Sequence, residues 1–394
     1  MPPTKRPNTH LPPARTDFPP REEAVPEIKN DQPTANTDTT EPDLLATFDP
    51  NGIGAANGNL YGLPFSPDTA ELVIVPVTWE VTVSYGAGTA RAPEAVLAAS
   101  PQLDLYDADY PNAWRRGIAM LPIDPDRLAH NDRLRTDAAQ YIQFLEQGGE
   151  IDQNETMRQI CAHINQACAQ LNADLKQQTL DLLKQGKKVG LLGGDHSSPL
   201  GFMEAIGEHY GKFGILQIDA HADLRNAYEG FTYSHASIMY NALQLPCVTH
   251  LVSVGVRDAC DAEIDLMRKH EKKTRAYYDH QIQRKVQLTR RYSWAEYCQK
   301  IIKKLPKQVY LSFDIDGLDP KLCPNTGTPV AGGLSFAEAA YLLRTLARSG
   351  RTIVGFDLCE VGIAQDTDWD ANVGARILYK LCGALLATQK TKKT

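Results

Sequence analysis

The sequence predicts an α/β fold, a three-layer α/β/α domain with a central, mainly parallel sheet. From residue 187 onward, short β-like apolar runs alternate with stretches whose apolar residues recur every three or four positions. Such alternation indicates parallel strands joined by helices that cover both faces of one sheet. A long segment from Asp132 to Gly186 also has helical spacing. Because the sequence shows no internal repeat and no second boundary, we expect a single domain over residues 43–394.

The elements follow one another in a regular order along the chain. The run ELVIVPVTWEV at residues 71–81 is the first predicted strand, because the turn-forming sequences SPD and SYGAG bound it. After the helical segment the strands and helices alternate, interrupted by a charged stretch at residues 258–304. The later predicted strands are 187–194, 213–219, 249–256, 308–316 and 352–361, and the later predicted helices are 199–211, 234–244, 336–350 and 371–389.

The first 42 residues differ from the rest of the chain in composition. They hold ten of the 25 prolines and have almost no periodic apolar pattern. Such a segment cannot bury enough apolar surface to offset its ordering entropy. We therefore expect residues 1–42 to be a disordered, Pro-rich N-terminal tail.

Charge and composition also limit the partners and the compartment. The formal net charge of -7 offers no basic surface for phosphates, so we expect no nucleic-acid partner. The sequence has no apolar run of about 18 residues and no secretory signal, so we expect no membrane contact and a cytoplasmic location. The eight cysteines form no CxxC pair, and any metal must therefore be bound by histidines and carboxylates.

Four predicted strands end in polar residues, at His196, Asp219, Asp314 and Glu360. In an open parallel sheet, ligands bind beyond the carboxyl ends of the strands. If these strands are neighbours, their polar ends meet at one place. Each residue taken alone has a simpler explanation, since an Asp after a strand, such as Asp195, is usually a turn former.

The motif DAHAD at the end of one predicted strand is harder to explain as a turn. In extended backbone, Asp219, His221 and Asp223 would project from the same face. Burying two carboxylates there without a cation would cost desolvation and repulsion energy. The same argument applies to Asp314 and Asp316, which end another buried run. The two motifs together predict a metal site.

The candidate ligands include four carboxylates, which is more negative charge than one divalent ion balances. Their number suits two ions that share carboxylates, and such a pair can hold a hydroxide near neutral pH, which predicts a hydrolase. Oxygen ligands with imidazole and no thiolate favour manganese, nickel or iron over structural zinc. The predicted metal ligands are His196, Asp219, His221, Asp223, Asp314 and Asp316.

The chain resembles the ureohydrolase superfamily, which includes arginases and agmatinases, over about residues 44–390. The resemblance rests on GGDHS (193–197), DAHAD (219–223), SFDIDGLDP (312–320) and Glu360. It implies the arginase-like form of the α/β/α fold and a two-metal centre that hydrolyses a guanidinium group to urea. By this resemblance His196, Asp219, Asp223 and Asp314 would hold one ion, and Asp219, His221, Asp314 and Asp316 would hold the other.

The resemblance also implies roles for three side chains. Asp223 would be catalytic, passing a proton from the attacking water to the leaving nitrogen. His235 matches the pocket histidine of the family and would shuttle protons or orient the substrate, although an ordinary histidine at a helix start remains the alternative. Glu360 would bind the guanidinium NH groups.

The substrate is predicted from the loops around these motifs. Residues 224–235 lack the Asn and Ser set with which arginases bind the α-amino and α-carboxylate groups, so arginine is disfavoured. The segments 223–241, 79–93 and 369–382 are most similar to the agmatinase-like branch that contains nickel-dependent guanidine hydrolases. We therefore expect free guanidine as substrate, with nickel favoured and manganese as the alternative metal. Five aromatic residues could narrow the pocket for a small substrate, namely Trp79, Tyr85, Tyr228, Phe231 and Tyr233.

Other functions remain as alternatives. The first is an agmatinase that releases urea and putrescine, followed by another guanidino-acid hydrolase. A non-catalytic partner subunit is disfavoured because it has no reason to keep the buried charges. A two-metal phosphoesterase is disfavoured because the motifs lack a phosphate cradle. The resemblance further implies a homo-oligomer, a trimer or hexamer, with metal-delivery accessory proteins if the metal is nickel.

Overall fold

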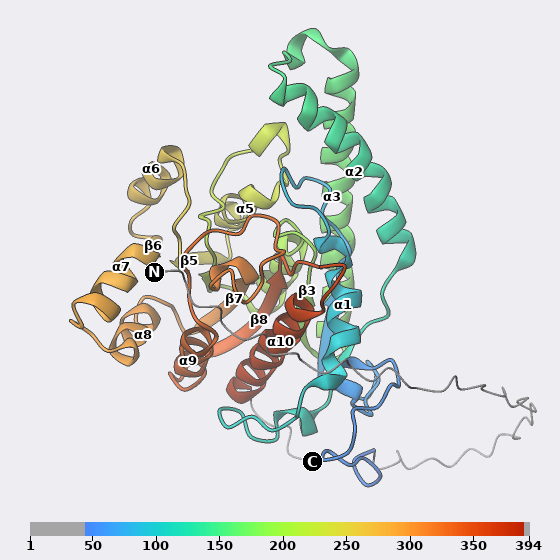
Figure 1. Ribbon diagram of the computed structural model, residues 1–394, viewed down its shortest axis with the longest axis vertical. Helices are drawn as coiled ribbons and strands as arrows, with labels where there is room; N and C mark the ends of the chain where they lie inside the picture. Colours follow the sequence, from blue (N-terminus) through green and yellow to red (C-terminus); the bar gives the residue numbers. More distant parts are fainter. Residues whose placement is uncertain (1–43, 390–394) are drawn as a thin grey trace, which may run out of the picture. The chain divides into compact units, whose positions relative to one another are not determined.

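The computed structural model describes residues 44–389 (Figure 1). The predicted disordered tail, residues 1–42, lies outside the described part of the chain. Among the described residues, no helix combines the length and apolar character needed to cross a membrane.

The described residues form one sheet of eight strands, and every pair of neighbouring strands is parallel. The order across the sheet is β2-β1-β3-β8-β7-β4-β5-β6. The predicted α/β/α fold with a mainly parallel sheet is therefore confirmed. The strands are β1 Leu72–Pro76, β2 Ile118–Met120, β3 Lys188–Leu192, β4 Phe213–Ile218, β5 Val248–Val254, β6 Thr274–Tyr277, β7 Gln308–Asp314 and β8 Thr352–Cys359.

Helices cover both faces of the sheet, so both sides of each central strand are buried. In β1, for example, Leu72 and Ile74 belong to one hydrophobic core and Val73 and Val75 to the other. This double burial explains why the strands appear in the sequence as continuous apolar runs. One face is covered by α1 Ala92–Ala99, α7 Asp279–Ile282, α8 Trp294–Ile302, α9 Phe336–Ala347 and α10 Trp369–Thr388. The other is covered by α2 Pro125–Glu146, α3 Glu155–Lys184, α4 Leu200–Tyr210, α5 Ile238–Gln244 and α6 Asp261–Lys269.

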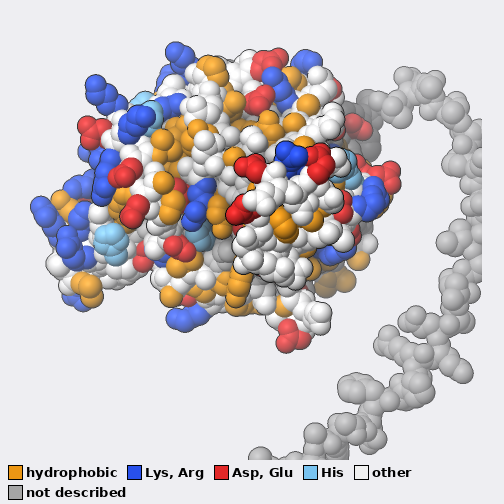
Figure 2. All heavy atoms as spheres, turned by 90° about the horizontal axis from the view of Figure 1, so that it is seen from above, with side chains coloured by type: hydrophobic (Ala, Val, Ile, Leu, Met, Phe, Trp, Pro, Cys, Tyr) orange, Lys and Arg blue, Asp and Glu red, His pale blue; other side chains and the backbone are white. Residues whose placement is uncertain are grey.

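Two parts of the chain depart from the sequence-based expectation. The helical segment 132–186 is two helices, α2 and α3, the long green pair in Figure 1, because the chain turns through Gly148 at a φ of 79°. The charged stretch 258–304 contains α6, β6, α7 and α8, and its many Lys and Arg side chains are largely exposed, as the blue spheres at the left of Figure 2 show. Neither β6 nor β2 was predicted. These edge strands have four and three residues, too few to form a recognisable buried run.

The four strands that end in polar motifs are consecutive neighbours at the centre of the sheet, as expected. Leu192, Leu358, Phe313 and Ile218 form one row across β3, β8, β7 and β4. All four side chains in this row are buried in the same core. Since the strands are parallel and in register, the polar residues that follow the row emerge at one edge of the sheet.

Candidate metal centre

The loop after β3 points the imidazole of His196 at three carboxylates. Its Nδ1 lies 3.1 Å from Asp219 Oδ2, 2.9 Å from Asp223 Oδ2 and 3.3 Å from Asp314 Oδ2. All four residues are buried, and Nδ1 itself forms no hydrogen bond. An imidazole nitrogen facing three carboxylate oxygens is a set of donors that fits a divalent cation.

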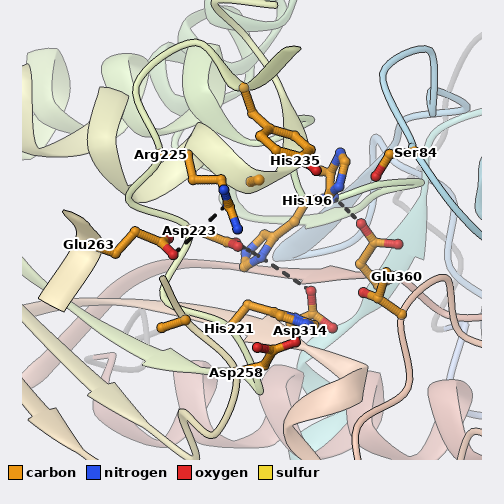
Figure 3. A pocket seen from close by; sticks show the side chains of 14 residues that line it. Ser84, His196, His221, Asp223, Arg225, His235, Asp258, Glu263, Asp314 and Glu360 are labelled. Carbon is orange, nitrogen blue, oxygen red and sulfur yellow. Dashed lines mark hydrogen bonds and ion pairs between the residues drawn. The ribbon is translucent and has the colours of Figure 1, made fainter. Parts of the chain in front are cut away.

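A second group of ligand atoms adjoins the first. His221 Nδ1 lies 3.0 Å from Asp316 Oδ2 and 3.7 Å from Asp219 Oδ1. The two oxygens of Asp219 therefore face different histidines, an arrangement that suits a carboxylate shared by two ions. The other oxygen of Asp316 accepts a hydrogen bond from the Ala220 amide at 3.0 Å, which fixes its orientation. The structure thus brings all six predicted ligands together, and Figure 3 shows four of them around one cavity.

The backbone of DAHAD is not the extended strand that the sequence suggested. Strand β4 ends at Ile218, and the chain then turns, with the His221 amide donating to Asp219 Oδ1 at 2.6 Å. Asp223 has a φ of 54° and Glu360 a φ of 61°, both in the left-handed region that side chains other than glycine rarely adopt. The three DAHAD ligands converge because of this turn and not because of strand alternation. Strained backbone of this kind is concentrated at functional sites.

The buried charges are unbalanced without a cation. Burial, together with the charge of Asp219, raises the pKa of Asp223 to about 7. Burial followed by the charges of Asp316 and Asp219 raises the pKa of Asp314 well above its usual value. Protons must therefore be retained in the cluster unless positive charge replaces them. The carboxylate excess fits divalent metal ions, which displace such protons when they bind.

A hydrogen-bond relay that was not predicted from the sequence orients His196. Its Nε2 lies 2.9 Å from Ser312 Oγ, and that hydroxyl donates to Asp357 Oδ1 at 3.0 Å. Ser312 and Asp357 are register partners on β7 and β8. A hydroxyl that donates to a carboxylate is left to accept from the imidazole, so Nε2 carries a proton, and Nδ1, which faces the carboxylates, is the nitrogen that can bind a cation.

Gln217 supports the shared carboxylate in a similar way. Its Nε2 donates to Asp219 Oδ2 at 2.9 Å, and its Oε1 accepts from Ser253 Oγ at 2.7 Å. Both residues are buried in neighbouring strands and are register partners. The only sequence signal for Gln217 is a polar residue inside an otherwise apolar strand, which alone does not reveal its partner.

Glu360 and His235, the two predicted substrate contacts, line the same cavity. Glu360 Oε1 accepts from the His196 amide at 2.9 Å, and burial followed by the charge of Asp195 raises the pKa of Glu360 well above its usual value. A cationic ligand would restore the ionised carboxylate. Burial, then the charges of His221 and His196, lowers the pKa of His235 to about 4, so its imidazole is neutral near pH 7.

The cavity has a volume of about 180 Å³. Sequence reasoning missed most of its outer wall, because these residues lie in loops or at a helix start whose position beside the motifs it did not predict. They are Ser84, Arg225, Asp258, Glu263 and Thr328.

The expectation that five aromatic residues narrow the pocket was wrong for all but one. Only Tyr228 lines the cavity. Trp79 and Phe231 are buried in a hydrophobic core, and Tyr233 packs against that core. Tyr85 is 82% exposed. Trp79, Phe231 and Tyr233 therefore contribute to core packing instead of filling the pocket.

Comparison with known proteins agrees with this geometry. The family model described as the arginase family matches residues 70–383. The chain is 30% identical over 296 residues to N(1)-aminopropylagmatine ureohydrolase of Thermus thermophilus, covering 75% of this chain and 83% of that protein. It is 30% identical over 333 residues to agmatinase of Proteus mirabilis, covering 83% of this chain and 91% of that protein.

The solved structures share the fold. Proclavaminate amidino hydrolase from Streptomyces clavuligerus superposes with a TM-score of 0.64 at 20% identity, covering 86% of this chain and 100% of that chain. Members of the matched family depend on two divalent metal ions, and the described residues hold two adjoining ligand groups. The chain belongs to the arginase family of ureohydrolases.

Proposed function

We propose that this ureohydrolase cleaves free guanidine to urea and ammonia. The observation that carries the proposal is the character of the cavity wall. Eleven of the 14 lining residues have polar or charged side chains, and the other three are Tyr228, Ala236 and Ala259. A four-carbon chain such as that of agmatine needs an apolar wall to compensate for leaving water.

The six clustered side chains would hold the two metal ions. His196, Asp219, Asp223 and Asp314 are proposed to bind one ion, and His221 and Asp316 to bind the second with the shared carboxylates of Asp219 and Asp314. We favour nickel because segments 79–93, 223–241 and 369–382 resemble those of nickel-dependent guanidine hydrolases, and a set of imidazole and carboxylate donors without thiolate accepts this ion. Manganese is the alternative, since the same ligand set accepts both.

The reaction adds water across one C–N bond of the guanidinium. When bound, the two ions would lower the pKa of a water molecule and so supply the nucleophile for the guanidinium carbon. Glu360 pairs with the guanidinium NH groups and orients the carbon. Asp223 takes a proton from the water and delivers it to the leaving nitrogen, so one C–O bond forms and one C–N bond breaks. The neutral imidazole of His235 accepts a hydrogen bond from the substrate and holds it in place.

Agmatine hydrolysis is the second candidate, and two observations favour it. The relatives with 30% identity are named for agmatine and aminopropylagmatine. Asp258, whose side chain is 69% exposed, also lines the cavity and could receive an ammonium group. The two candidates therefore differ in what the outer wall accepts, and the inner metal ligands are common to both.

A substrate panel separates these candidates. Apo-protein loaded with either nickel or manganese is assayed for urea release from guanidine, agmatine and arginine. We expect the highest kcat/KM for guanidine, and higher activity with nickel. Equal or greater kcat/KM for agmatine would reject guanidine as the substrate, and greater activity with manganese would reject nickel.

We also propose that the enzyme is a cytoplasmic homo-oligomer. All eight cysteines are free thiols, which is usual in a reducing compartment. The trimer or hexamer rests on family resemblance, and light scattering during size-exclusion chromatography tests it.

A further inference from the structure

We infer that Arg225 makes the site selective against guanidino compounds that carry a second positive charge. The inference rests on the proposed function and names the residue that would exclude agmatine. Arg225 follows the DAHAD turn, where its backbone amide donates to Ala236 O at 3.0 Å. Its guanidinium carbon lies 4.6 Å from the centre of the Tyr228 ring, and both side chains line the cavity. The stacking holds a positive charge at the wall.

Glu263 forms an ion pair with Arg225 only at the outer limit of distance for such a contact. Glu263 Oε2 lies 4.0 Å from Arg225 Nε, too far for a hydrogen bond. The same carboxylate already accepts from the Leu224 amide at 2.9 Å and from the Cys260 amide at 2.9 Å, where it caps α6. Since Glu263 is held by these amides, Arg225 keeps positive potential directed into the cavity.

The position of Arg225 relative to Glu360 determines which substrates meet this positive potential. In Figure 3 the two residues lie on opposite sides of His196 and Asp223. A guanidinium bound to Glu360 near the metal ligands therefore directs any chain on its far side toward Arg225. Free guanidine has no such chain, whereas agmatine would bring its ammonium toward a like charge.

Asp258 does not cancel the effect. Its side chain is 69% exposed, so water screens its attraction for a cation. Arg225 is less exposed, at 40%, and is stacked on a ring. The repulsion from Arg225 is therefore expected to exceed the attraction of Asp258.

Two probes isolate the charge from the length of the chain. Agmatine and n-butylguanidine share a four-carbon chain and differ in the terminal ammonium. Calorimetry on metal-loaded protein gives the dissociation constant of each compound. Inhibition of guanidine hydrolysis gives a second measure of binding, and the quantity compared is the ratio of the constant for agmatine to that for n-butylguanidine. In the native protein we expect n-butylguanidine to bind about tenfold or more tightly than agmatine. Equal binding, or tighter binding of agmatine, would overturn the inference.

Three variants assign that difference to Arg225. Arg225→Gln should bring the ratio of the two constants close to one, and Arg225→Lys, which keeps the charge, should preserve most of it. Arg268→Gln is the matched control, because it removes a surface arginine, 76% exposed and paired with Asp265, from the nearby helix. An unchanged ratio in Arg225→Gln, or an equal fall in Arg268→Gln, would contradict the role of Arg225.

The native protein provides a test that requires no variant to fold. Raising the ionic strength from about 0.05 to 0.5 M shortens the screening length and should reduce the ratio severalfold. A ratio independent of salt would show that the discrimination is steric and would overturn the inference. The proposed function fails separately, if the native protein releases no urea from guanidine. Guanidine hydrolysis with an unchanged ratio in Arg225→Gln rejects only the role of Arg225.

Discussion

The relay from His196 through Ser312 to Asp357 predicts that Ser312→Ala weakens metal binding without removing any metal ligand. The substitution deletes two buried hydrogen bonds, of 2.9 and 3.0 Å. Asp357 Oδ1 keeps a bond of 3.3 Å from the Phe313 amide, but it lies 3.7 Å from His196 Nε2 and cannot replace the hydroxyl. The imidazole N–H is then buried without a partner, which costs about 1–3 kcal/mol of unfolding free energy.

The effect on metal affinity is predicted from the lost orientation of the imidazole. Removing an outer hydrogen-bond partner of a metal ligand typically costs about 10–100-fold in affinity. Competition with a chelator gives the dissociation constant, and urea denaturation of the apo-protein gives the free energy of unfolding. Ser100→Ala is the matched control, since Ser100 is buried and makes two hydrogen bonds in the core, to Leu97 O and from the Tyr61 amide. Native metal affinity in Ser312→Ala would refute the relay, and so would an equal loss in Ser100→Ala.

Three further predictions concern the metal ligands and Glu360. Asp219→Ala should lose both bound metal and urea release. Asp126→Ala, at the exposed start of α2, is the control and should match the native protein. Full metal content in Asp219→Ala would contradict a shared carboxylate. Burial lowers the pKa of His221, but the charges of Asp316 and Asp219 have the larger effect and raise this pKa to about 12. The imidazole is therefore protonated near pH 7, and a metal ion must displace that proton when it binds. Affinity should therefore fall from pH 8 to pH 6 with protons released on binding, and calorimetry in two buffers that detects no proton release would refute this. Glu360→Gln should raise KM for guanidine about tenfold or more and change kcat less, and steady-state kinetics with an unchanged KM would exclude the proposed contact.

The central sheet could be predicted from the sequence because its strands are buried on both faces. Runs such as Leu72–Pro76 are apolar at every position, which distinguishes them from their surroundings. The edges could not be predicted in this way, since Ile118–Met120 and Thr274–Tyr277 are short. The break at Gly148 was missed because helical spacing resumes soon after it.

The clustering of the candidate ligands could be predicted because parallel strand ends share one edge. The supporting residues could not, since they depend on strand order and register. Ser312 and Asp357 are 45 positions apart in the chain and meet only because β7 and β8 pair in that register. Arg225 lies in the loop after β4 and Glu263 in the first turn of α6, and local sequence patterns do not specify which side chains such segments bring to a cavity wall.

The strand order has a consequence for when the metal can be bound. The strand synthesised last, β8, lies between β3 and β7, and Glu360 follows it directly. Until β8 has inserted, β3 and β7 have no common neighbour to hold them, and His196 is not aligned with Asp314. The complete set of ligands therefore forms only after residue 360 has left the ribosome. Binding of metal by the complete set of ligands is therefore expected to follow the insertion of β8 into the sheet.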